Sequence, residues 1–183
     1  MDRGIGHWVT KRAFLNGRRT AFLSGDASFT YDDLERRTNQ VASSLLGLGV
    51  RKGDRVAVLL MNSVEFMEVL LSCSKLGAIT VPINVRLAGP EIGFILADAG
   101  ADVLVFHEPL AAAAVAALAE PGVRVRRVVR VGNGVADGEL AYTELLSGDG
   151  ATPLDIDVAG GDPAFIMYTS GTTGRPKGAI LTH

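Results

Sequence analysis

The chain has 183 residues, a formal net charge of −2 and a single cysteine. The length allows one or two domains, the weak negative charge gives no case for nucleic-acid binding, and one cysteine cannot form an internal disulfide. Because the charged first residues hold no signal-peptide core and no apolar run nears the roughly 18 residues of a membrane span, we expect a cytoplasmic protein.

The first clear helix begins at Thr30. The Thr30 hydroxyl can cap the amide of Asp33 while the Asp33 carboxylate reaches back, a variant of the capping box. Apolar residues then recur on one face, as in a helix packed on a core, and Gly49 is expected to end the helix. The residues of this apolar face are Leu34, Val41, Leu45 and Leu48.

Beyond Gly49, strands and helices are predicted in alternation. Residues 56–60 form a continuous apolar run, suited to a parallel strand covered on both faces. Asn62 is expected to cap the helix that Gly77 stops, and Pro90 marks the first turn of another. The remaining predicted elements are a helix over 5–16, strands over 20–24, 79–83, 102–106 and 126–131, and helices over 89–99 and 110–119. This alternation predicts an α/β fold of βαβ units, with a mostly parallel sheet flanked by helices.

Other candidate features support simpler interpretations. Cys73 lies on an apolar helix face and is predicted to be a buried small hydrophobe. The histidines lack metal-ligand spacing, so no zinc site is predicted. The Gly/Asp-rich stretch 147–161 is a candidate boundary within the chain. A basic strip is predicted to be a solvated face, with anionic lipid or a CoA phosphate as the alternative contact. The strip comprises Arg124, Arg126, Arg127 and Arg130.

The segment 168–178 carries the strongest functional signal. It joins two apolar runs, 164–167 and 179–181, which we interpret as buried strands. Glycines allow a backbone to approach a ligand closely, successive amides form a nest for anions, and lysine binds phosphate as a point charge. A plain turn would not need so many hydroxyls, and the segment departs from a Walker loop because Pro176 stands at the second glycine position. Its polar and glycine residues are Thr169, Ser170, Gly171, Thr172, Thr173, Gly174, Lys177 and Gly178.

The run Tyr168-Thr-Ser-Gly-Thr-Thr-Gly-Arg-Pro-Lys-Gly178 resembles the phosphate loop of the AMP-forming acyl-CoA synthetases. That adenylate-forming family includes 4-coumarate ligases, luciferases and peptide-synthetase adenylation domains. Two weaker motifs, at 29–34 and 75–84, are similar to other family elements in the same order. The stretch 75–87 resembles acyl-CoA ligases more than the amino-acid-activating branch, an inference by analogy.

The resemblance implies a two-step reaction with ATP, Mg²⁺ and CoA. A carboxylate would first attack ATP to give an acyl-adenylate and pyrophosphate, and a thiol would then take the acyl group. Thr169 matches a catalytic position beside Mg²⁺ and phosphate, and Lys177 matches the catalytic loop lysine. The other residues matched to ATP phosphate binding are Ser170, Gly171, Thr172, Thr173 and Gly174.

The resemblance also implies that residues 1–183 are the N-terminal part of the large ATP-binding domain, ending after the loop and lacking the C-terminal domain. Alone, this part is expected to be inactive and to self-associate through an exposed apolar face. The expected substrate is a fatty or other apolar acid, and a peripheral membrane contact remains open. Two alternatives remain: a non-catalytic nucleotide-binding or assembly module, and an adenylation domain that loads a carrier protein.

Overall fold

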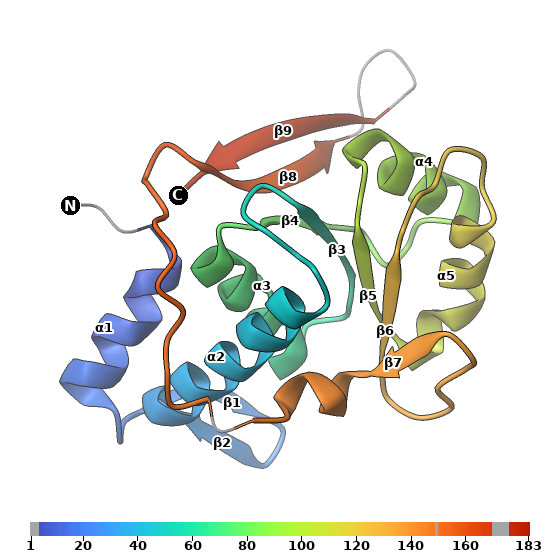
Figure 1. The fold of residues 1–183 in the computed structure, drawn as a ribbon. Coiled ribbons are helices and arrows are strands. Elements are labelled where there is room, and N and C mark those ends of the chain that lie inside the picture. The colour runs from blue at the N-terminus through green and yellow to red at the C-terminus, as the bar shows by residue number, and fades with distance from the viewer. Residues whose placement is uncertain (1–3, 149, 170–175) are drawn as a thin grey trace.

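The computed structural model describes residues 4–148, 150–169 and 176–183, and in that part a seven-stranded sheet organises the chain (Figure 1). The strand order is β7-β6-β5-β3-β4-β8-β9, with β1 and β2 in a separate hairpin. All neighbours in the large sheet are parallel except β8 and β9. The strands are β1 (Thr20–Ser24), β2 (Ala27–Thr30), β3 (Arg55–Leu59), β4 (Ile79–Pro82), β5 (Val103–His107), β6 (Arg127–Val131), β7 (Glu139–Ala141), β8 (Pro163–Thr169) and β9 (Lys177–Thr182).

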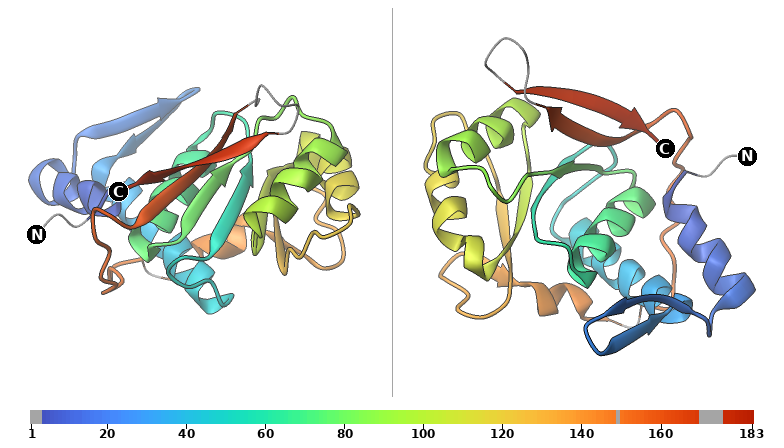
Figure 2. Two further views of the ribbon diagram at one scale, coloured as in Figure 1. Left: turned by 90° about the horizontal axis from the view of Figure 1, so that it is seen from above. Right: turned by 180° about the vertical axis from the view of Figure 1, so that it is seen from behind.

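Helices cover both faces of the sheet, as the alternation of elements predicts (Figures 1 and 2). Val56 and Val58 of β3 face a core shared with α2 and α3, whereas Ala57 and Leu59 face a core shared with α4 and α5. The predicted α/β fold with a mostly parallel sheet is therefore confirmed. The helices are α1 (Gly6–Asn16), α2 (Tyr31–Gly47), α3 (Val64–Leu76), α4 (Gly89–Ala99) and α5 (Ala111–Leu118), with short 3-10 helices η1 (Glu108–Leu110) and η2 (Tyr142–Leu146).

The helix ends follow local capping chemistry. At α2, Asp33 N donates to Thr30 Oγ1 and Thr30 N donates to Asp33 Oδ2, both at 3.1 Å, which confirms the capping box. The hydrogen bonds from Thr30 lower the pKa of Asp33. At α3 the predicted cap is wrong by one position: Ser63, not Asn62, accepts from the following turn. Gly77 ends α3 in the left-handed conformation, as predicted.

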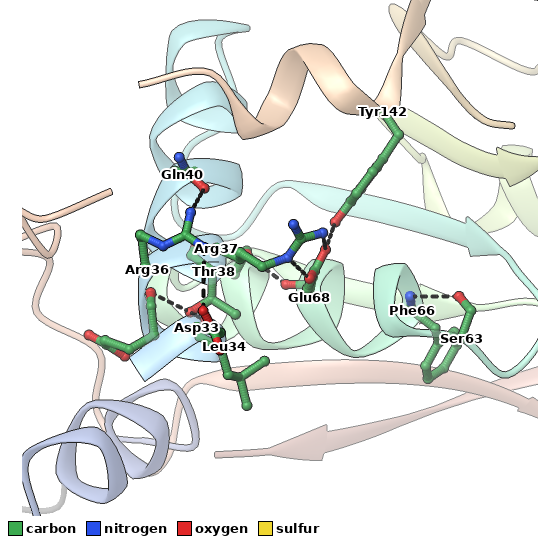
Figure 3. Close-up of polar contacts among 12 residues, drawn as sticks. Asp33, Leu34, Arg36, Arg37, Thr38, Gln40, Ser63, Phe66, Glu68 and Tyr142 are labelled. Carbon is green, nitrogen blue, oxygen red and sulfur yellow. Dashed lines mark hydrogen bonds and ion pairs between the residues drawn. The ribbon is translucent and has the colours of Figure 1, made fainter. Parts of the chain in front are cut away.

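A buried carboxylate joins α2, α3 and η2 (Figure 3). Glu68 of α3 is fully buried and receives two hydrogen bonds from the guanidinium of Arg37 on α2. The Tyr142 hydroxyl of η2 donates to Glu68 Oε2 at 2.6 Å. Burial, followed by the Glu68 charge, raises the pKa of Tyr142, which keeps it a donor. A buried charge needs such partners, because an unpaired one is strongly destabilising.

The prediction that the basic strip is a solvated face is in part wrong. Arg130 of β6 is buried and pairs with Glu139 of β7, with nitrogen–oxygen distances of 2.6 and 3.0 Å. Arg126 is exposed but donates to Asp102 at 2.9 Å. Two of the four cations are therefore neutralised by carboxylates. Cys73, in contrast, is fully buried as predicted, and burial raises the pKa of its thiol to about 12.

The two strands around the functional segment are not both buried. In β8 only Ala164 and Phe165 are buried, and every residue of the edge strand β9 is exposed. Sheet order explains this, because β8 pairs with β4 at a single position and β9 pairs only with β8. Among the described residues, no helix is long and apolar enough to cross a membrane.

The connection before β8 packs along the domain. Asn39 of α2 donates to the Gly150 carbonyl at 3.1 Å, and Lys52 donates to the Asp157 carbonyl at 2.8 Å. Among its described residues, 147–148 and 150–161, no helix or strand forms. These contacts hold the connection against α2 and the turn between α2 and β3, and the division of the chain near 147–161 stays a prediction.

Candidate phosphate-binding site

The end of the β8–β9 hairpin that adjoins the connecting segment places two of the predicted site residues opposite each other. Thr169 and Lys177 are paired in the antiparallel register, at the last and first positions of their strands. Directly opposed side chains lie on one face of a strand pair. Both residues are exposed, and neither side chain has a hydrogen bond or ion pair with another described residue. The Thr169 hydroxyl and the Lys177 ammonium are thus both accessible to a ligand on the same side.

The same end of the hairpin is attached to α4 through Tyr168. The Tyr168 hydroxyl donates to Asp98 Oδ2 at 2.6 Å. Burial, followed by the Asp98 carboxylate, raises the pKa of Tyr168, so the hydroxyl remains protonated. Figure 1 shows the hairpin lying along the edge of the sheet, with this end beside α4. The contact holds the backbone that presents Thr169.

Gly178 provides the space for that arrangement. It is the register partner of Tyr168, and a Cβ at Gly178 would lie 2.6 Å from Ile166 Cγ2 and 3.1 Å from the Tyr168 ring. Any larger residue would therefore displace the Ile166 side chain, the tyrosine ring or the strand. The glycine of the motif has a packing role in addition to the predicted proximity to a ligand.

The base of the hairpin has its own anchor. Lys52 Nζ lies 2.6 Å from Asp162 Oδ2, just before β8. The hydrogen bond from Lys52 is the main cause of the lowered pKa of Asp162. His183 N donates to the Asp162 carbonyl, and His183 Nδ1 accepts from Ile5 N at 3.2 Å. Contacts at both ends therefore position the hairpin.

Other predicted phosphate contacts fall in a part of the chain that the structure does not describe. Thr169 and Lys177 flank that part, and the assignment of ATP contacts within it stays a prediction. The residues concerned are Ser170, Gly171, Thr172, Thr173 and Gly174.

The predicted Mg²⁺ contact rests on Thr169. Among the described residues, no group of three or more His, Cys, Asp or Glu side chains could hold a metal ion. Mg²⁺ usually keeps several waters and binds through substrate phosphates with few protein ligands. A single accessible hydroxyl such as that of Thr169 fits this mode, and the contact stays a prediction.

Two further features lie apart from the hairpin end. Lys75, in the second resemblance motif, is largely buried and bonds Glu35 Oε2 at 2.6 Å and Asn39 Oδ1 at 2.5 Å. Burial lowers its pKa, and Glu35 opposes that effect. The role of Lys75 is thus to join α2 and α3.

A cleft of about 670 Å³ between α1 and residues 153–159 includes neither Thr169 nor Lys177.

Sequence reasoning missed the Tyr168–Asp98 and Arg37–Glu68–Tyr142 contacts. Tyr168 opens the recognised motif, which was a signal that it matters, but Asp98 lies 70 positions earlier with no distinguishing pattern. Nothing local in the sequence marks a helical glutamate as buried, because its partners come from other elements.

Open, mostly parallel α/β sheets commonly bind nucleotides at the ends of their strands, and here a hydroxyl- and glycine-rich sequence follows β8. Comparison with known proteins agrees with the class of nucleotide-binding enzymes. The family model described as AMP-binding enzyme matches residues 9–183. The chain belongs to the AMP-binding enzyme family.

Several relatives are named as CoA ligases, and one, from Streptomyces coeruleorubidus, is named as a fatty acid–[acyl-carrier-protein] ligase. The chain is 43% identical over 182 residues to a feruloyl-CoA synthase from Amycolatopsis sp, covering 100% of this chain and 34% of the relative. It is 40% identical over 185 residues to the long-chain-fatty-acid–CoA ligase FadD13 from Mycobacterium tuberculosis, covering 99% of this chain and 35% of the relative. A crystal structure of the anthranilate CoA ligase AuaEII with anthranoyl-AMP superposes with a TM-score of 0.88 and 31% identity, covering 98% of this chain and 35% of that one. The chain thus spans about a third of the length of these relatives.

Proposed function

We propose that the chain is the N-terminal part of an ATP-dependent acyl-CoA ligase, and that its hairpin end binds the phosphates of ATP. The observation that carries this is the pairing of Thr169 with Lys177. A hydroxyl and a cation, both exposed, lie opposite each other at the two ends of a segment rich in hydroxyls and glycine. The CoA-ligase names of the relatives support the same activity.

In the first step, a carboxylate oxygen of the acid attacks the α-phosphorus of ATP, and pyrophosphate leaves. The product is an acyl-adenylate. Negative charge grows on the leaving pyrophosphate; in this proposal Lys177 neutralises part of it and Thr169 orients a phosphate oxygen. Bound Mg²⁺ supplies further charge neutralisation at the phosphates. The protein mainly positions the reactants, since this step needs little covalent help.

In the second step, the thiol of CoA attacks the acyl carbonyl and AMP leaves. The acid we propose has an apolar body, either fatty or aromatic. Three of the relatives are named for feruloyl, long-chain fatty and anthranilate substrates, which share an apolar body attached to a carboxylate. The division between fatty and aromatic acids depends on residues that line the acyl site.

The test is pyrophosphate release by the full-length protein, across a panel of fatty and aromatic acids, with and without CoA. We expect acid-dependent release, and an acyl-CoA product when CoA is present. The Lys177→Ala variant should lower this activity, and Lys11→Ala, which removes an exposed lysine from α1, should not. ATP binding without acid-dependent release would refute the ligase and favour a non-catalytic module. Transfer to the pantetheine thiol of a carrier protein, but not to CoA, would identify the carrier-loading alternative.

A further inference from the structure

Helix α1 directs large apolar side chains away from the protein. Its buried residues are Gly6 and Val9, and it packs against α2 and α3. On the outer side Trp8 is 61% exposed, Leu15 57% and Phe14 88%. Figures 1 and 2 show α1 at the periphery of the molecule. Contiguous exposed apolar patches on soluble proteins usually mark an interaction site.

The exposed face also carries positive charge. Trp8, Lys11, Arg12 and Leu15 follow the i, i+3, i+4, i+7 spacing of a single helix face and together line one shallow surface hollow. An indole and a leucine are thus flanked by two long cationic side chains. Such cations extend their charged ends past an apolar surface while their stems cover it.

The charge around this helix contrasts with that of the whole chain. Residues 4–25 contain four Lys and Arg and no Asp or Glu, in a chain of net charge −2. Within the described part of the chain, none of these four cations forms an ion pair. Arg126 and Arg130 of the basic strip are paired with carboxylates, whereas all four of these cations are exposed and have no such partner among the described residues. These four cations are Lys11, Arg12, Arg18 and Arg19.

We propose that the outward face of α1, defined by Trp8, Lys11, Arg12 and Leu15, docks on an anionic phospholipid surface. Interfacial helices combine Trp, Phe or Leu with Lys and Arg in this way, placing the apolar groups among the acyl-chain boundary and the cations at the headgroups. A second copy of the chain is a poor occupant, because a symmetric contact would bring the same cations together. The inference does not depend on the proposed ATP chemistry.

The first two acidic residues that follow α1 in the chain do not neutralise this face. Asp26 lies in the turn between β1 and β2, and Asp32 lies beside Gly17 at the end of α1. Neither forms an ion pair with Lys11 or Arg12. The hollow at Trp8 therefore keeps a positive rim, which attracts anionic headgroups within a Debye length.

The test is co-sedimentation of the full-length protein with vesicles of phosphatidylcholine alone or with 30% phosphatidylglycerol. We expect binding to the anionic vesicles only, weakened by added salt. Lys11→Glu combined with Arg12→Glu should reduce the partition coefficient by about tenfold or more. Trp8→Ser combined with Leu15→Ser should also reduce it, and this loss should persist in high salt because it is apolar.

Matched controls separate this face from general charge and apolarity. Arg124→Glu combined with Arg127→Glu reverses two exposed cations elsewhere, and Val115→Ser removes an exposed apolar group from α5. Neither should change binding. Circular dichroism of each variant checks folding. An absence of vesicle binding, as would follow if another part of the enzyme covered α1, overturns the proposal, and so does an equal loss in the control variants.

Discussion

The buried Glu68 cluster gives the sharpest stability prediction. Replacing Arg37 by Met removes both guanidinium hydrogen bonds and leaves a fully buried carboxylate with the Tyr142 hydroxyl as its remaining side-chain donor. Breaking a buried ion pair on one side costs about 3–5 kcal/mol. Tyr142→Phe removes one hydrogen bond to a charged group, worth about 1.5–3 kcal/mol. Arg37→Met is therefore expected to destabilise the protein more than Tyr142→Phe does.

Arg36→Met is the matched control on the same helix. The Arg36–Asp33 ion pair is 3.6 Å long and its side chains are 48% and 41% exposed. An exposed pair of this kind contributes about 0–1 kcal/mol. Figure 3 shows the two arginines one position apart, with Arg37 directed to Glu68 and Arg36 directed to Asp33 and Gln40. The comparison therefore isolates the effect of burying the ion pair, since both variants replace an arginine of α2 by methionine.

The assay is amide hydrogen exchange of peptides from α2 and α3 in the full-length protein, which reports local opening without requiring two-state unfolding. Because 1.4 kcal/mol corresponds to a factor of ten, Arg37→Met should speed exchange at least about a hundredfold, and Arg36→Met less than about fivefold. Replacing Arg37 and Glu68 by Met together with Tyr142 by Phe should recover most of the protection, because neither a charge nor an unpaired hydroxyl is then left buried. Equal exchange in the two arginine variants would refute the reasoning.

Three further predictions concern the hairpin and the first capped helix. Lys177→Ala should lower kcat/KM for ATP in the full-length enzyme, by an amount that corresponds to about 1.5–3 kcal/mol of activation free energy, the value of a charge-assisted hydrogen bond. Unchanged steady-state kinetics would remove Lys177 from phosphate binding. Gly178→Ala should lower the thermal unfolding midpoint because its Cβ would lie 2.6 Å from Ile166 Cγ2 and 3.1 Å from the Tyr168 ring. Gly161→Ala should leave the midpoint within a degree or so, because a Cβ there would have nothing within 4 Å. Thr30→Ala should cost about 1 kcal/mol near pH 7. The folded-state pKa of Asp33 is lowered, so this stabilisation is complete above the unfolded-state pKa and is lost as pH falls through the folded-state value. Urea unfolding should therefore show the penalty shrinking towards pH 3, and a penalty independent of pH would contradict the role of Asp33.

Local patterns in the sequence predicted most of the fold. The run 56–60 predicted a strand buried on both faces, and β3 has Val58 in one core and Leu59 in the other. The Thr30 capping box and the Gly77 stop were also confirmed, since each depends on atoms within a few residues. The short strands β2 and β7 were missed. Strands of four and three residues carry little periodic signal, and pairing with a neighbour defines them.

Part of the candidate site was likewise predictable from local sequence, and part depended on how the strands pair. Tyr168 to Gly178 form a continuous segment, so their residue types alone indicated phosphate binding. The pairing of Thr169 with Lys177 follows from the register of β8 with β9. The exposure of β9 could not be inferred from its apolar residues, because an edge strand has a neighbour on one side only. Its burial depends on what packs on it and not on its own composition.

The amino-acid sequence by itself determined the class of fold, the family and the segment that we assign to ATP, because each rests on signals contained in short stretches of chain. Only the tertiary structure decided which charged residues are buried and with which partners. Glu68 meets Tyr142 across 74 positions and Tyr168 meets Asp98 across 70. Burial is a property of packing between distant elements, and an isolated stretch of sequence carries no record of it.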